Sequence, residues 1–224
     1  MDDLSQIINE IEGQIEKGLW DLELKAQLEQ AMQVYRQAEA KLAELNIAPD
    51  DSAFGEGQRV LSYCLMRQEN LLRQMGQPQE ALALGAREIA AARASGDVIT
   101  LARALMSNGT NLILTGGSEP GLRLLEEARE LFESGESIDH KQGLGWYWIL
   151  QADLANAGLV KREPSEVIGM ATRALEILEP IENWPGVARA YAARANAHEK
   201  KGDMEAAAQE RREQEVYERK IESD

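Results

Sequence analysis

The stretch LLRQMGQPQEALALGAREIAAARASGD, residues 71–97, decides the fold. A helical run ends at Gly76, a short break follows, and a second helical run begins. A glycine just past a helix end can take the left-handed conformation that closes the last turn. Pro78 suits the start of the second helix, because proline's fixed φ and missing N–H are tolerated in a first turn. The stretch therefore predicts two helices joined by a tight turn.

The same organisation recurs in the stretches that begin at residues 111, 154 and 197. Small residues recur at matched distances from each turn, seven positions before the glycine and five after it. Small side chains at these places let the two helices of a pair approach closely. The turn glycines, spaced 40, 42 and 44 residues apart, are Gly76, Gly116, Gly158 and Gly202, and the small residues are Gly109 and Ala195 before them and Ala81, Gly121 and Ala207 after them.

This order of small residue, glycine and small residue resembles the tetratricopeptide repeat family over about residues 58–222. Glu69 and Gln151 stand where the first small residue is expected, and Val167 where the later alanine is. The period is longer than the family's usual length of about 34 residues, which implies longer helices. The resemblance implies an all-α, right-handed superhelical solenoid of antiparallel helix pairs, with about ten helices.

Residues 1–57 are expected to form an N-terminal helical hairpin cap and a linker, and residues 58–224 four repeats of one continuous solenoid. The linker is NIAPDDSAFGEG, residues 46–57, where proline, glycine and acidic residues break the helices. Before it, an apolar stripe alternates by four and three residues. This stripe is either the seam by which a long helix packs on its neighbours or a self-pairing coiled coil: Leu24, Leu28, Ala31, Tyr35, Ala38, Leu42 and Leu45.

The net charge of the chain limits the classes of partner that it can bind. The net charge of −15 argues against DNA or RNA as the main partner, because phosphate contacts need a cationic face. Residues 58–117 depart from it, with six basic and four acidic side chains, a net charge of +2. The single cysteine, Cys64, excludes an internal disulfide and indicates a reducing compartment. The acidic N-terminus is not a signal peptide, and no apolar run is long enough for a membrane, so we expect a cytoplasmic protein.

No motif predicts catalysis. TGGSEP, residues 115–120, lacks the lysine of a phosphate loop, and Ser118 is better interpreted as the N-cap of a helix. His198 is expected at a helix end and His140 in an exposed loop between repeats, with no second metal ligand near either. The sequence therefore predicts a protein that is not an enzyme and that needs no cofactor or metal.

The resemblance implies that the first helix of each pair lines a concave groove. We therefore predict a non-enzymatic scaffold that binds a protein or peptide there, with an acidic or C-terminal segment as the partner. A ligand-responsive regulator and a self-assembling homo-oligomer stay open as alternatives. Alternatively, Arg67, Arg73 and Arg103 could pair with Glu69, Glu80 or Glu88 across helix turns and have no role in binding. The predicted partner-binding residues are Tyr63, Arg67, Asn70, Arg73, Arg103, Ser107, Thr110, Trp148, Arg189, Asn196 and Lys200.

Overall fold

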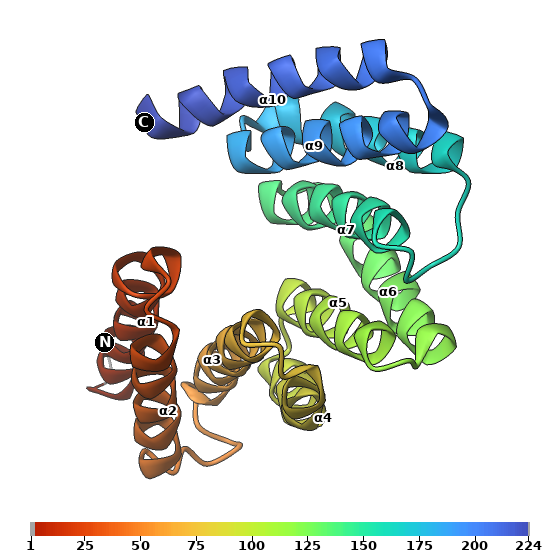
Figure 1. Ribbon diagram of the computed structural model, residues 1–224. Coiled ribbons are helices and arrows are strands. Elements are labelled where there is room, and N and C mark those ends of the chain that lie inside the picture. Colours follow the sequence, from red (N-terminus) through yellow and green to blue (C-terminus); the bar gives the residue numbers. More distant parts are fainter. Residues whose placement is uncertain (1–2, 224) are drawn as a thin grey trace. The chain divides into compact units, whose positions relative to one another are not determined.

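The computed structural model describes residues 3–223 and contains ten α-helices and two short 3₁₀ helices in that range (Figure 1). No strand occurs among these residues, so the predicted all-α fold of helix pairs is confirmed. The chain divides into two compact units, Met1–Leu124 and Leu125–Asp224, which we call unit 1 and unit 2. None of the helices in the described range is long and apolar enough to cross a lipid bilayer.

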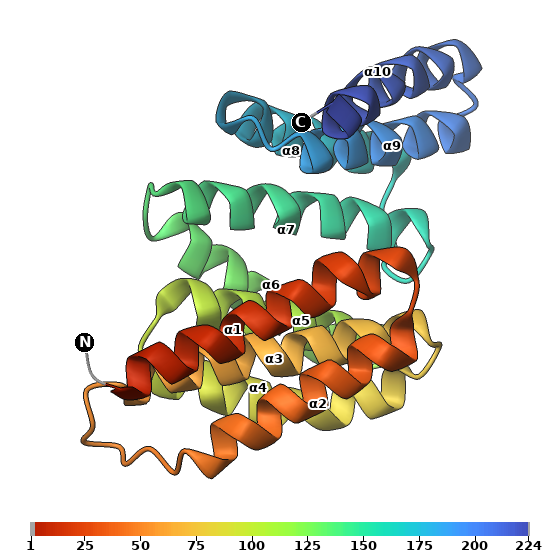
Figure 2. The same cartoon turned by 90° about the vertical axis from the view of Figure 1, so that its left-hand side faces the viewer.

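Unit 1 is built around α3, which packs on α1, α2, α4 and α5 (Figure 2). The helices α1, α3 and α5 lie side by side as one layer, and α2 and α4 cover that layer. The elements of this unit are α1 (Asp3–Asp21), η1 (Glu23–Lys25), α2 (Leu28–Glu44), α3 (Phe54–Gln74), α4 (Pro78–Ser95), α5 (Val98–Leu114) and the first residues of α6 (Ser118–Glu133).

Unit 2 repeats this arrangement with fewer helices. Here α7 and α9 lie side by side, α8 packs on both of them, and α10 packs on α9. The elements that follow the end of α6 are α7 (Ile138–Asn156), α8 (Pro164–Leu178), η2 (Glu179–Ile181), α9 (Trp184–Lys201) and α10 (Met204–Ser223).

The turns have the backbone conformation that the glycines predict. Gly76, Gly116, Gly158 and Gly202 have φ angles of 73°, 94°, 74° and 84°, in the left-handed region. In the first of these turns, the N–H of Gln77 donates to the carbonyl of Leu72 at 2.8 Å, which closes the end of α3. Proline starts the following helix in two of the four pairs, at the first residue of α4 and of α8.

Three local predictions need correction. The linker ends earlier than residue 57, because α3 begins at Phe54 after the Asp51 carboxylate accepts the Ala53 N–H at 2.8 Å. Ser118 is the first residue of α6 rather than the residue that caps it. His140 lies in the first turn of α7 and not in a loop, because Ser137 caps that helix and accepts its N–H. His198 lies in the last turn of α9, as predicted.

The stripe on α2 is an intramolecular seam. Ala31, Tyr35, Ala38 and Leu42 are buried in one cluster with apolar residues of α1 and α3, while Leu24 lies outside α2 and is 62 % exposed. The packing interpretation of the heptad pattern is therefore confirmed. In unit 2 the interior is built largely from alanine, which brings α7, α8 and α9 close together. One cluster of buried residues there consists of Ala152, Ala155, Val167, Ala171, Ala193 and Ala197.

Candidate functional site

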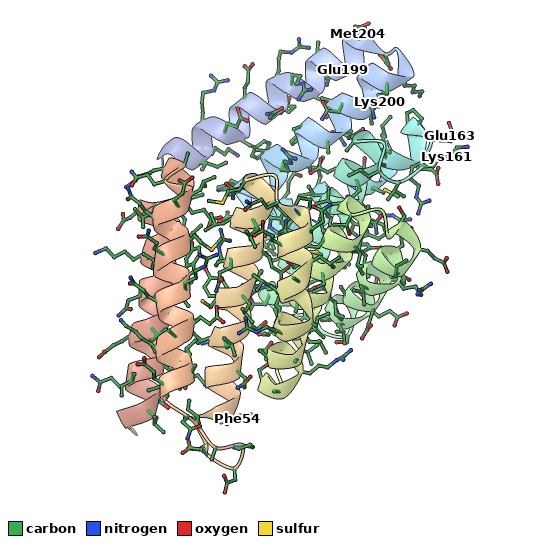
Figure 3. The ribbon with its side chains drawn as sticks, turned by 60° about the horizontal axis from the view of Figure 1, so that its bottom comes forward. Phe54, Lys161, Glu163, Glu199, Lys200 and Met204 are labelled. Carbon is green, nitrogen blue, oxygen red and sulfur yellow. The ribbon has the colours of Figure 1, made fainter. Side chains whose placement is uncertain are left out.

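A pocket of about 570 Å³ lies in unit 2 between α7 and α9. We call it the α7–α9 pocket. Three of the predicted partner-binding residues meet in it, all from α9, and the end of α7 supplies most of the remainder. Figure 3 shows two of its charged residues, Glu199 and Lys200, at the end of α9. Its lining is Asp153, Leu154, Asn156, Ala157, Leu159, Arg189, Asn196, Glu199 and Lys200.

The charges of this pocket are mostly balanced inside unit 2. Arg189 pairs with Asp153, with 2.9 Å between Nη2 and Oδ2. Burial raises the pKa of the Asp153 carboxyl above its ordinary value, and Arg189 opposes that rise. Glu199 lies 3.2 Å from the Arg211 guanidinium. Lys200 differs from these residues, because its ammonium group donates to the main-chain carbonyl of Asn156 and not to a carboxylate.

Asn156 gives the pocket an unused hydrogen-bond acceptor. Its side-chain Nδ2 donates to the Ala193 carbonyl at 2.9 Å, which fixes the orientation of the amide. Its Oδ1 atom is buried and has no hydrogen-bond partner among the described residues. A buried carbonyl oxygen without a donor costs about 1–3 kcal/mol, so a ligand N–H placed there would recover that cost.

The predicted groove arginines of unit 1 are occupied by the chain itself. Arg67 donates through Nε to Oε2 of Glu23 at 3.1 Å and also pairs with Oε1. Glu23 is only 5 % exposed and accepts further bonds, at 2.8 Å from the Tyr35 hydroxyl and at 3.2 Å from the Gln74 amide. Arg67 therefore neutralises an interior carboxylate that the α1–α2 hairpin contributes.

Arg73 lies in a second interior network. Its guanidinium donates to Oδ1 of Asn111 at 2.7 Å and to the Ser107 hydroxyl at 3.3 Å, and it also bonds Asn70. Ser107 in turn donates to Glu69 at 3.0 Å, and the guanidinium lies 4.0 Å from the same carboxylate. Four of the predicted residues thus stabilise the interior of unit 1: Arg67, Asn70, Arg73 and Ser107.

Glu69 belongs to a buried pair of acids. Glu69 on α3 is 0 % exposed and Glu88 on α4 is 1 % exposed. Asn111 donates to Oε2 of Glu69, and Asn108 donates to Oε2 of Glu88 at 2.8 Å. The Oε1 atom of each has no hydrogen-bond partner among the described residues, if both are ionised.

One proton resolves this conflict. The two carboxyl groups interact directly, and burial raises the pKa of both above the ordinary value. The neighbouring Glu69 raises the pKa of Glu88 further, because two like charges disfavour each other. One proton shared by the two carboxyl groups would supply the missing donor and halve the buried charge. We call these residues the Glu69–Glu88 pair.

A smaller pocket of about 240 Å³ in unit 1 includes Glu88 in its lining. We call it the α1–α3–α5 pocket, after the layer that supplies most of its lining. Glu88 reaches it from α4, and two of the predicted residues, Tyr63 and Arg103, also line it. The complete lining is Glu12, Glu16, Arg59, Ser62, Tyr63, Met66, Glu88, Thr100 and Arg103.

The two remaining predicted residues, Thr110 and Trp148, make contacts within their own helix or pack against the interior. The Thr110 hydroxyl donates to the carbonyl of Met106 at 2.8 Å within α5. Trp148 is half-buried, meets Tyr147 edge to face at 5.0 Å, and carries the Arg173 guanidinium 4.8 Å above its ring. Tyr147 is buried, at 4 % exposure.

Sequence reasoning did not select Glu88, Asn108 or Asn156 as site residues. Only Glu69 carried a signal, since it occupies a position where a small buried residue is expected. Residues 3–223 include no group of three or more His, Cys, Asp or Glu side chains placed to hold a metal ion.

Comparison with known proteins identifies the architecture. No protein-family model and no curated protein matches the sequence. The crystal structure of BtubC (BKLC) from P. vanneervenii matches over 100 % of this chain and 94 % of that chain, with a TM-score of 0.62 at 13 % identity. A second match is the crystal structure of nearly identical TPR-like repeats from a Podosopora anserina putative kinesin light chain. It covers 100 % of both chains, with a TM-score of 0.59 at 13 % identity. The chain has a tetratricopeptide-like repeat fold.

Proposed function

We propose that the protein is a non-enzymatic module that binds a protein or peptide segment in the α7–α9 pocket. The observation that carries this proposal is that one pocket lining holds both Asn156, whose buried Oδ1 atom has no partner within the described residues, and the exposed side chain of Lys200. An acceptor and a cation in one lining suit a polypeptide, which offers an N–H donor and a carboxylate.

The chemistry of the pocket selects the kind of segment. Lys200 is exposed and, within residues 3–223, its ammonium group bonds a neutral carbonyl and no carboxylate, so a ligand carboxylate can replace or share that bond with a net gain in charge compensation. Leu159, 38 % exposed, gives the pocket an apolar wall for the partner's side chains. We therefore propose an acidic or C-terminal segment, with one main-chain N–H on Asn156 and its carboxylate on Lys200.

This proposal places binding in unit 2 and assigns no contact to Arg67 or Arg73. Both arginines neutralise interior carboxylates, so presenting them to a partner would leave Glu23 and Glu69 buried and uncompensated. Arg189 and Asn196 are placed to fix the register of the segment, because they lie along α9 on the same pocket.

The test is a titration with short peptides. An array of peptides with free or amidated C-termini selects the best segment, whose affinity is then measured by fluorescence anisotropy. Lys200→Glu should weaken binding at least about tenfold, equivalent to about 1.4 kcal/mol. Lys201→Glu is the matched control, since it makes the same charge change at the next residue of α9 and outside the lining.

Three outcomes would overturn the proposal. The first is an array on which no peptide binds the wild-type protein above background. The second is equal affinity of the Lys200→Glu and Lys201→Glu variants. The third is a selected peptide that loses no affinity when its carboxylates are removed.

A further inference from the structure

Glu88 of the Glu69–Glu88 pair borders a pocket. It is 1 % exposed, yet it belongs to the lining of the α1–α3–α5 pocket. Its Oε1 atom is buried and has no hydrogen-bond partner among the residues that the structure describes. An interior acid with one unused oxygen thus lies against a pocket.

The charges around the pocket leave room for a cation. Arg59 is held by a bidentate ion pair with Glu12, with both N–O distances at 2.7 Å, so the two cancel. Glu16 is exposed on α1, and its negative charge is matched by the positive charge of Arg103, so the lining apart from Glu88 has no net charge. Tyr63 and Met66 contribute apolar surface to the lining.

The groups that face the acid pair come from two helices. The titratable or charged one is Arg73 on α3, whose guanidinium lies 4.0 Å from Glu69. The neutral ones, which donate or bond to the pair or to Arg73, are Ser107, Asn108 and Asn111 on α5. On the pocket side the charged and titratable groups are Glu12, Glu16, Arg59, Tyr63 and Arg103.

We propose that the α1–α3–α5 pocket binds a primary alkylammonium group, which takes the place of the proton shared by Glu69 and Glu88. The ammonium group enters protonated, the shared proton leaves to solvent, and two ionised carboxylates then face one cation. Charge balances, because one positive charge replaces another. The source of the group is a lysine side chain of a partner or a free polyamine.

Size and chemistry favour this ligand class. A volume of about 240 Å³ is below the roughly 300–1,000 Å³ of pockets for drug-sized ligands, and suits a single side chain. An ammonium group has three donors and no acceptor, which matches a site that offers carboxylate oxygens. The alkyl stem would lie along Tyr63 and Met66 while the charged end reaches Glu88, as lysine stems commonly pack on apolar surface. This site is separate from the α7–α9 pocket and does not depend on the proposed function.

Calorimetric titration of the whole protein tests the proposal. The probes are N-acetyl-lysine methylamide, which represents a lysine side chain, and spermidine, which represents a free polyamine. N-acetyl-norleucine methylamide is the neutral control. Titrations at pH 7 in two buffers with different ionisation heats give the number of protons released. We expect at least one ammonium probe to bind with release of up to one proton, and its affinity to rise by up to about tenfold per pH unit.

A matched pair of variants locates the site. Glu88→Gln keeps a hydrogen-bond donor toward Glu69 and removes the exchangeable proton, so it should fold, with a circular dichroism melting temperature at pH 7 at least as high as that of the wild type. Binding of the ammonium probes should fall at least tenfold and proton release should disappear. Glu80→Gln, on the exposed first turn of the same helix, should bind like the wild type.

The outcomes separate clearly. Binding by only one of the two ammonium probes supports the proposal and identifies the source of the ligand. The proposal fails if neither probe binds at 20 mM, if the norleucine control binds equally well, or if binding releases no proton. Proton release is measured on the wild type, so an unfolded Glu88→Gln variant would not rescue a negative result.

Discussion

The helix pairs of the two units pack through different kinds of buried side chain. Among the described residues, unit 1 buries eight polar or charged side chains, whereas unit 2 buries one, Gln151. Seven of the eight make side-chain hydrogen bonds or ion pairs that connect η1, α2, α3, α4 and α5. Unit 2 instead packs alanines, together with glycines whose Cβ positions are filled by neighbouring side chains.

This difference teaches what each unit is sensitive to. A buried polar group is stable only while its partner is present, so unit 1 depends on matched pairs. An alanine-rich interior depends on close approach, so unit 2 is sensitive to added volume. The same repeat pattern therefore yields one unit that is sensitive to lost charge partners and one that is sensitive to added atoms.

Removing one partner from unit 1 should give the largest effect. Arg67→Met keeps much of the side-chain stem and leaves the carboxylate of Glu23, with 3 % of its side chain exposed, without its cation. We expect a loss of about 3–5 kcal/mol in the free energy of unfolding, measured by urea denaturation with far-UV circular dichroism. Arg123→Met removes an exposed ion pair with Glu119 and should cost no more than about 1 kcal/mol. Equal losses in the two variants would refute the importance of the buried pair.

Adding one methyl group to unit 2 should give the next largest effect. A Cβ atom at Gly145 on α7 would lie 2.4 Å from Cγ of the buried Leu178. We expect Gly145→Ala to cost about 1–3 kcal/mol in the same assay. Gly169→Ala on α8 has nothing within 4 Å of the added atom and should stabilise the helix by up to about 1 kcal/mol. Stabilisation by both substitutions would mean that the interior of unit 2 tolerates volume.

The smallest effect should come from Glu88→Gln at mildly acidic pH, because glutamine imitates the protonated acid. Burial raises the folded-state pKa of Glu69 and Glu88 above the unfolded value of about 4.3, so the folded protein holds more protons. Their contribution to stability is complete below that value and is lost as the pH rises through the folded pKa.

The variant should weaken this loss. Urea midpoints of the wild type and of Glu88→Gln should therefore agree below about pH 4 and diverge as the pH rises above it, with the variant more stable. Glu80→Gln should follow the wild type at every pH. A constant difference between wild type and Glu88→Gln across the pH range would exclude titration of the pair.

Local chemistry made the turns and the apolar seams predictable. The left-handed glycines and the prolines at helix starts act within a few residues, so Gly76 and Pro78 predict their turn without knowledge of the rest of the chain. The stripe on α2 likewise follows from helical spacing. The predicted starts of α3 and α6 differ by a few residues from the observed starts at Phe54 and Ser118. Before α3, the hydrogen bond between the Asp51 carboxylate and the Ala53 N–H sets where the first turn begins.

The interior networks could not be predicted in the same way. Arg67 finds Glu23 across 44 residues and Arg73 finds Asn111 across 38, and both pairings depend on how the helices pack. The repeat register did mark two unusual positions. Glu69 and Gln151 occupy places expected for small residues, and both are buried. The pattern marked these two positions as departures from the repeat, while their burial and their partners follow from tertiary structure.

The single thiol of the chain lies inside the unit with the polar interior. Cys64 on α3 is 0 % exposed, its Sγ donates to the Tyr35 carbonyl at 3.1 Å, and burial raises the pKa of the thiol to about 12. A water-soluble disulfide reagent can therefore react only in an open form of unit 1 that exposes this thiol. When reclosing is faster than modification, the labelling rate is proportional to the equilibrium population of that open form. The labelling rate of Cys64 in the protein without any substitution thus reports the population of the open form of unit 1.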